Sequence, residues 1–159
     1  MDSIFSNFLN QVLDESKAFV TELDSYLAEH RCKRMIKPAA KGYLVTYTLP
    51  DSGKSLLNFV FRKGCVKVRV YAAHVSEYEN IIEAFPEKTK KEIATALDCK
   101  KLTGKTCSPT CPAGYVFVMD GVKYKKCRSM AFLPALNVEN NPIIRKMIEE
   151  ELRFVSLNI

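Results

Sequence analysis

The sequence predicts an α+β fold: a two-layer domain with a largely antiparallel sheet built from hairpins and helices on one face. Two pairs of strand-like segments are separated by the two-residue turns Lys63-Gly64 and Asp120-Gly121, which is typical of β-hairpins. Helical periodicity marks the start, centre and end of the chain, and hairpins rather than crossover helices join the strands. A chain of 159 residues suits a single domain, 1–159, with its α+β body at about 40–155.

The first segment predicts one long helix over about 3–31. Its apolar residues recur at intervals close to a helical turn: Ile4, Phe8, Val12, Phe19, Leu23 and Leu27. Ser3 suits the N-cap position of this helix. We therefore expect a helix that packs its apolar stripe against the core.

Three strands are predicted after Pro38, beginning with an alternating segment at 43–49. The segments LLNFVFR (56–62) and CVKVRVY (65–71) flank the Lys63-Gly64 turn, which pairs Arg62 with Cys65 and Phe59 with Val68. In this register the apolar side chains share one face of the sheet, and a shift by one residue would bury the charges.

The other face of this hairpin forms a basic patch with one aromatic ring. Its predicted ligand-binding residues are Arg62, Lys67, Arg69 and Tyr71. Clustered cations on one surface favour an anionic ligand, either a small phosphate or carboxylate metabolite or a nucleic-acid backbone. The alternative is an ordinary solvated sheet face.

The second half of the chain predicts two short helices, a hairpin and a final helix. Apolar residues at 78–85 form one helical stripe, and Pro86 opens a second helix that ends near Cys99. YVFVM and VKYKKC flank Asp120-Gly121, and SMAFL (129–133) is a further candidate strand. Pro142 opens the last helix.

Four of the six cysteines cluster in the sequence as Cys99-x7-Cys107-x3-Cys111-x15-Cys127. The Asp120-Gly121 hairpin places Cys127 opposite Gly114, and the three residues back to Cys111 span at most about 10–11 Å. Four convergent thiolates suit tetrahedral Zn²⁺. We therefore predict a structural zinc site made of these four cysteines.

Other uses of the same thiols stay open. The four cysteines could bind an iron–sulfur cluster, form disulfides, or pack as unliganded core residues. Neighbouring lysines lower thiol pKa values, so a cysteine-based redox sensor or thiol enzyme is also conceivable, with Cys107 or Cys111 as the nucleophile. Cys32 and Cys65 have no partner at a recognisable spacing.

The composition and the distribution of charge indicate which binding partners and which cellular compartment to expect. The net charge of +6 raises the prospect of an anionic partner, but there is no long basic block, so nucleic acid is less favoured than a small ligand. No apolar run is long enough to cross a bilayer, and the N-terminal segment lacks the features of a secretory signal. These patterns predict a cytoplasmic protein without a membrane partner, in which thiols are reduced or metal-bound.

No catalytic residue is predicted. The two histidines, His30 and His74, have no Ser, Cys or Asp partner at a spacing typical of a catalytic motif. The sequence favours a non-enzymatic binding or regulatory domain, with the cysteine-based redox sensor or thiol enzyme as the alternative.

The segment NFVFRKGCVKVRVYAAH (58–74), followed by Tyr78 and the Pro86 turn, resembles small bacterial domains of the YdhG-like kind. The resemblance covers residues 40–100. It implies a compact cytoplasmic α+β domain, and iron handling has been suggested for some members of that group. The four-cysteine segment departs from their pattern, so the resemblance implies the fold class and no functional residues.

Overall fold

The computed structural model describes residues 2–157 and confirms the α+β class. Four strands form an antiparallel sheet in the order β1-β2-β3-β4, and two more form a separate hairpin. The strands are β1 (Lys33–Pro38), β2 (Tyr43–Thr48), β3 (Ser55–Arg62), β4 (Cys65–Val70), β5 (Tyr115–Met119) and β6 (Val122–Lys126).

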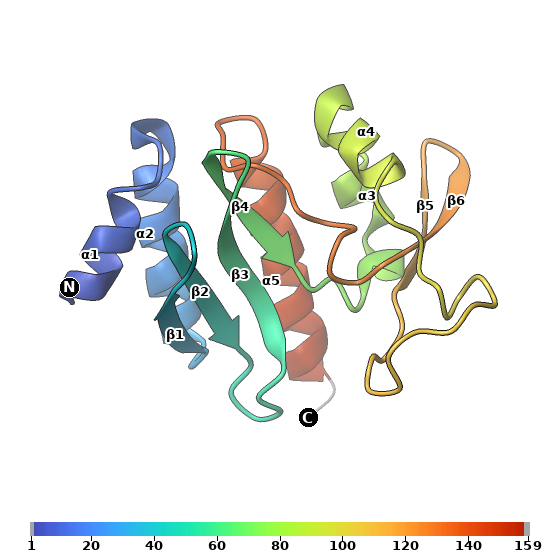
Figure 1. The fold of residues 1–159 in the computed structure, drawn as a ribbon, viewed down its shortest axis with the longest axis horizontal. Coiled ribbons are helices and arrows are strands. Elements are labelled where there is room, and N and C mark those ends of the chain that lie inside the picture. The colour runs from blue at the N-terminus through green and yellow to red at the C-terminus, as the bar shows by residue number, and fades with distance from the viewer. Residues whose placement is uncertain (1, 158–159) are drawn as a thin grey trace.

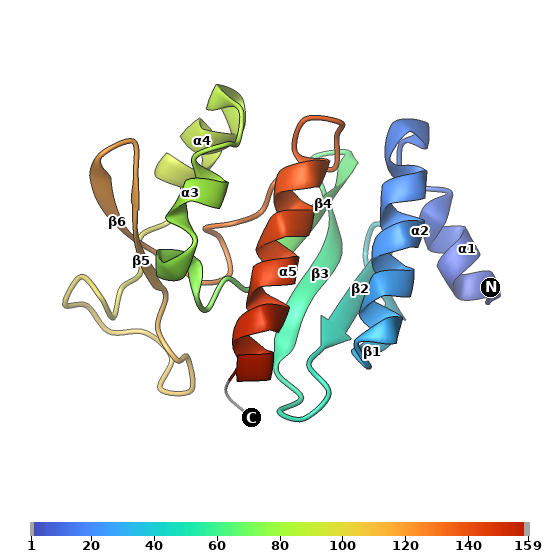
Figure 2. The ribbon, with the colours of Figure 1, turned by 180° about the vertical axis from the view of Figure 1, so that it is seen from behind.

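The helices form a layer behind the larger sheet and a group beside the hairpin. They are α1 (Ser3–Leu9), α2 (Asp14–Glu29), the short 3₁₀ helix η1 (Val75–Glu77), α3 (Glu79–Ile82), α4 (Glu87–Ala94) and α5 (Asn141–Leu157). Helices α2 and α5 cover one face of the four-stranded sheet, and α3 and α4 lie next to β5 and β6 (Figures 1 and 2). Within residues 2–157, none of the helices has the length and apolar character needed to cross a membrane.

The prediction of one long helix over 3–31 is wrong, because the segment forms two helices. Asp2 caps α1, since its Oδ1 accepts a hydrogen bond from the Phe5 N–H at 2.8 Å. The break between the helices leaves Leu13 exposed, and the acidic residues Asp14 and Glu15 lie in the first turn of α2. Negative charge there favours a new helix start through the helix dipole.

The predicted β3–β4 register is confirmed in full. Arg62 pairs with Cys65, Phe59 with Val68, and Leu57 with Val70. The Asp120-Gly121 hairpin is also confirmed, with Met119 opposite Val122. Both pairs of turn residues have positive φ angles, which is the backbone conformation that a two-residue hairpin of this twist requires.

Strand β1 was missed by the sequence analysis. Its sequence, KRMIKP, is short, charged and ends in proline, so it carries little strand pattern. It forms because it pairs residue by residue with β2, from Lys33 opposite Thr48 to Pro38 opposite Tyr43. Its lysines and proline are typical of an outer strand that avoids pairing with other chains.

The candidate strand at 129–133 does not form a regular strand. Instead, the chain from 132 to 136 lies along the outer edge of β4. The Val68 N–H donates to the Pro134 carbonyl at 3.0 Å, and the Val70 N–H donates to the Phe132 carbonyl at 2.9 Å. The segment covers an edge of the sheet that would otherwise be unpaired.

Side chains from α3 and α4 hold the β5–β6 hairpin. Glu79 accepts from the Val118 N–H at 2.7 Å, and Glu83 accepts from the Asp120 N–H at 2.8 Å. Lys90 of α4 forms a 2.9 Å ion pair with the Asp120 side chain. The hairpin is therefore fixed to the body, and the cysteine loop (residues 100–114) connects the segment after α4 to β5.

Candidate ligand-binding face and thiol segment

The four predicted ligand residues lie where the register requires, on the face of the sheet away from α2 and α5. The side chains of two of them are partly covered and bonded to neighbouring groups. Lys67 is 13% exposed, and its Nζ lies 3.8 Å from Glu92 Oε2. Arg69 donates from Nε to the Ser129 carbonyl at 2.7 Å and from Nη1 to Asn58 Oδ1 at 3.2 Å. The sequence predicts that the charges of Lys67 and Arg69 lie outside the core and are exposed; this exposure is wrong, because α4 and the chain around Ser129 pack against this face.

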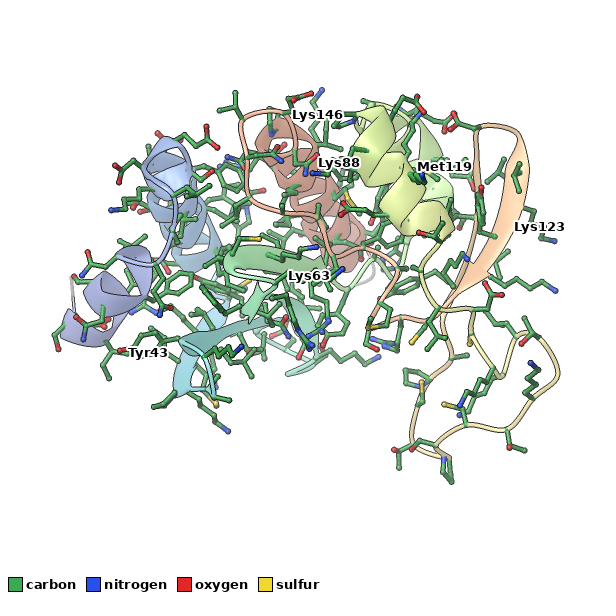
Figure 3. All side chains as sticks on the ribbon, turned by 45° about the horizontal axis from the view of Figure 1, so that its top comes forward. Tyr43, Lys63, Lys88, Met119, Lys123 and Lys146 are labelled. Carbon is green, nitrogen blue, oxygen red and sulfur yellow. The ribbon has the colours of Figure 1, made fainter. Side chains whose placement is uncertain are left out.

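The first cavity on this face, which we call the sheet cavity, has a volume of about 440 Å³. Its lining residues are Ala39, Ala40, Lys41, Tyr43, Leu44, Val60, Phe61, Arg62 and Arg69. Three of these residues are cations and none is acidic. Figure 3 labels Tyr43 at the β2 side of this region and Lys63 in the turn after β3. The sheet cavity thus joins positive charge to apolar and aromatic walls.

A second cavity, of about 490 Å³, lies between the β3–β4 turn and α4. Arg62, Lys63 and Lys67 line one side, and Glu92 of α4 contributes the single carboxylate. Its remaining walls are apolar or neutral, from α4 and from residues 130–134. Arg62 lines both cavities, so it lies between them on the basic face, which is the side of the sheet that carries Arg62, Lys67, Arg69 and Tyr71.

At the other end of the face, Arg128 lies between two tyrosines and was not singled out from the sequence. Its Cζ is 5.5 Å from the Tyr71 ring centroid and 5.9 Å from the Tyr115 ring centroid. Tyr71 also connects to the sheet, because Asn58 Nδ2 donates to the Tyr71 hydroxyl at 3.4 Å. Nothing in the local sequence marks Arg128, which simply follows Cys127; only the fold brings it to Tyr71.

The four predicted zinc ligands occupy different environments. Cys99 is buried, Cys107 is exposed, and Cys111 and Cys127 are half-buried. Within residues 2–157, no group of three or more His, Cys, Asp or Glu side chains is placed to hold a metal ion. The structure does not gather the four thiols around one point, and their role as zinc ligands stays a prediction.

Part of the expected convergence is nevertheless present. A short ladder joins the segment after α4 to β6, with the Cys99 N–H donating to the Lys125 carbonyl at 2.9 Å and the Cys127 N–H donating to the Leu97 carbonyl at 2.8 Å. Gly114 packs against the neighbouring Lys126, since a Cβ built on Gly114 would lie 2.0 Å from its carbonyl oxygen. Because Tyr115 pairs with Lys126 as predicted, Gly114 lies beside the peptide group that joins Lys126 to Cys127, as the predicted register requires.

The Cys99 sulfur lies in a pocket of backbone N–H groups. The Gly114 N–H donates to Cys99 Sγ at 3.2 Å. Burial raises the pKa of Cys99, but the N–H groups of Leu102, Gly114 and Lys101 and the Lys101 charge outweigh this effect and leave the pKa below that of an ordinary thiol. The Lys101 ammonium also donates to the Cys111 carbonyl. The chain therefore stabilises negative charge on this sulfur.

The sequence did not predict a buried hydrogen-bond network that joins Glu151, His74 and Tyr78. Glu151 of α5 accepts hydrogen bonds from the His74 N–H at 2.9 Å and from the Tyr78 hydroxyl at 2.6 Å, and its Oε1 lies 2.9 Å from His74 Nδ1. The His74 ring stacks on Phe154 with centroids 5.0 Å apart. Because these residues lie in different parts of the chain, no motif could have paired them. The network joins η1 and α3 to α5.

Comparison with known proteins adds no relative: no family model, no curated protein and no solved structure matches the chain. The resemblance to YdhG-like domains stays a prediction.

Proposed function

We propose that this protein is a binding domain for a small anionic ligand and that the ligand occupies the sheet cavity. The observation that carries the proposal is the charge of the lining. Lys41, Arg62 and Arg69 face a cavity of about 440 Å³ that no carboxylate lines. Cations brought together without a compensating acid repel one another, and an anion relieves that repulsion.

The walls indicate the class of ligand. Arginine presents a planar set of donors that suits carboxylate and phosphate groups. Tyr43 and Phe61 add aromatic surface, and Val60 and Leu44 add apolar surface. A concave site with few polar groups and apolar walls is typical of small-molecule binding. We therefore favour a metabolite with an anionic group and an apolar or planar portion over a nucleic-acid backbone.

A thermal-shift screen of phosphorylated and carboxylated metabolites, followed by calorimetric titration, tests this proposal. Arg62→Gln and Lys41→Gln are each expected to weaken binding of a hit about 10- to 100-fold, because each removes a charge-assisted hydrogen bond. Lys123→Gln is the matched control, since Lys123 projects outward from β6, away from the sheet cavity (Figure 3).

Two results would overturn the proposal. One is a hit whose affinity is the same in Arg62→Gln, Lys41→Gln and the control. The other is preferential binding of nucleic acid with an affinity that falls steeply with salt, as counterion release requires.

We also propose that Cys99, Cys107, Cys111 and Cys127 hold a structural zinc ion. The observation that favours this second candidate is the set of backbone N–H groups directed at Cys99, because zinc binds thiolates and those groups favour the thiolate. Cys107 lies in an exposed part of the cysteine loop, so binding requires that loop to close toward Cys99. The ion would stabilise the loop, and four sulfur ligands leave no open position for catalysis.

Elemental analysis of protein purified without chelators tests the zinc proposal. One equivalent of zinc is expected in the parent and in the control Cys65→Ser, and a loss of zinc is expected in Cys99→Ser. Metal far below one equivalent in a stably folded, reduced parent would exclude the site. Thiol alkylation against pH would then examine the redox-sensor or thiol-enzyme alternative, which requires a cysteine that titrates below about 8.5.

A further inference from the structure

Tyr115 and Arg128, whose hydrogen-bond donors have no partner within residues 2–157, lie at the end of the basic face, beyond the sheet cavity. The Tyr115 side chain is only 5% exposed. Among the residues that the structure describes, its hydroxyl is the one buried side-chain polar atom without a hydrogen-bond partner. Buried polar groups are nearly always paired, because leaving one unpaired in the interior destabilises the fold. A ligand that accepts a hydrogen bond would remove this cost.

Arg128 is the second donor. Its guanidinium is half-buried against the rings of Tyr71 and Tyr115, and no ion pair or hydrogen bond of this guanidinium is found within residues 2–157. Three other arginines of this chain are paired with acids, for example Arg34 with Asp24 at 2.9 Å and Arg153 with Glu150 at 2.6 Å, whereas Arg62, like Arg128, has no ion pair within residues 2–157. The Arg128 guanidinium is therefore charged, lies against two aromatic rings, and has N–H donors available to bind a ligand.

The surroundings of Arg128 supply more donors. Arg69 reaches the same region, because its Nε bonds the carbonyl of Ser129, the residue after Arg128. The Tyr71 hydroxyl lies beside Asn58 Nδ2 at 3.4 Å. Burial raises the pKa of the Tyr115 hydroxyl above its usual range and the Glu151 carboxylate adds to the rise, against the opposing effects of the Arg128 charge and the Ala72 N–H, so Tyr115 keeps its proton at neutral pH. The side chains of Arg128, Tyr71 and Tyr115 therefore lie together here, with Arg69 linked to Tyr71 through Asn58.

We propose that Arg128, Tyr115 and Tyr71 form a subsite for a phosphate group, with Arg69 beside them. A tetrahedral oxyanion has several acceptor oxygens, which matches a site with several donors, and guanidinium donors form short, strong hydrogen bonds to phosphate. The subsite goes beyond the sheet cavity, because it should bind inorganic phosphate alone, whatever the cavity accepts.

Titration of inorganic phosphate into the protein, followed by amide chemical shifts and calorimetry, tests the inference. Arg128→Gln is expected to raise the phosphate Kd about 10-fold or more, and Tyr115→Phe about 2- to 10-fold. The control Lys123→Gln and the sheet-cavity variant Lys41→Gln should leave this Kd unchanged. If Lys41→Gln abolishes phosphate binding and Arg128→Gln does not, the subsite is wrong while the sheet cavity stands.

Thermal unfolding supplies an independent readout. Because the Tyr115 hydroxyl has no partner, Tyr115→Phe should leave Tm unchanged or raise it without phosphate, and should reduce the rise in Tm that phosphate causes in the parent. A fall of several degrees in Tm without phosphate would mean that the hydroxyl is already bonded, and would refute the inference. If Arg128→Gln does not fold, Arg128→Lys decides: an unchanged phosphate Kd there refutes the subsite, and a weaker one supports it.

Discussion

Gly114 offers a sharp test of how the thiol segment is packed. Its backbone lies outside the left-handed region, so alanine is permitted conformationally. A Cβ at this position would however lie 2.0 Å from the Lys126 carbonyl oxygen and 3.0 Å from Cys99 Cβ. The segment that holds Gly114 and the end of β6 would have to separate by about 1 Å to restore a normal contact. That movement would also weaken the 3.2 Å hydrogen bond from the Gly114 N–H to Cys99 Sγ.

The magnitude follows from these two losses. Overpacking costs about 1–3 kcal/mol, and the hydrogen bond adds about 1 kcal/mol, so Gly114→Ala should destabilise the protein by about 2–4 kcal/mol. Urea unfolding measures this directly, and Tm should fall by about 4–16 °C in a chain of this size. Removing an N–H donor from the thiolate should also raise the pKa of Cys99, which alkylation against pH reports.

The control is Gly104→Ala in the same loop. Gly104 has a φ of 83° with no atom within 4 Å of a built Cβ, so the change should cost only the backbone strain of about 1–2 kcal/mol and leave the pKa of Cys99 as it was. If Gly114→Ala unfolds at the same urea concentration as the parent, the close approach to Lys126 is wrong.

Three further predictions concern the body of the domain. Glu151→Ala leaves the buried Tyr78 hydroxyl unpaired and should cost about 2–5 kcal/mol in urea unfolding; a loss under 1 kcal/mol would contradict the network. Arg69→Ser should lower the free energy of unfolding by about 1–3 kcal/mol, because two hydrogen bonds are lost. Lys67→Ser should lower it by less than about 1 kcal/mol, because only the contact with Glu92 is lost. Equal losses in the same urea assay would contradict the different bonding of these two side chains. The pKa of Asp2 is held below its ordinary value of 3.8, first by the hydrogen bond from the Phe5 N–H and then by the charge of Arg34. The stability that ionised Asp2 adds to the folded state is therefore complete above pH 3.8 and is lost as the pH falls through the lowered pKa of the folded state. Hydrogen exchange of α1 should show this loss in the parent and not in Asp2→Asn; equal pH dependence in both would refute it.

Local sequence patterns were sufficient to predict the two hairpins and which side chains of β3 and β4 face the core. A two-residue turn such as Lys63-Gly64 fixes which residues pair, and the alternation along both strands then fixes which side chains face the core. These features depend on a few neighbouring residues, so they could be worked out without knowing the rest of the fold. The helix opened by Pro142 was predictable for the same reason.

The functional surroundings were decided by the tertiary structure. Lys67 and Arg69 were correctly placed on one face, but their burial depends on α4 and on the chain around Ser129. Arg128 gains significance only because the fold brings it against Tyr71. Periodicity and turn chemistry report local backbone preference, whereas burial, ion pairing and cavities arise where distant segments meet, and those meetings leave no local pattern in the sequence.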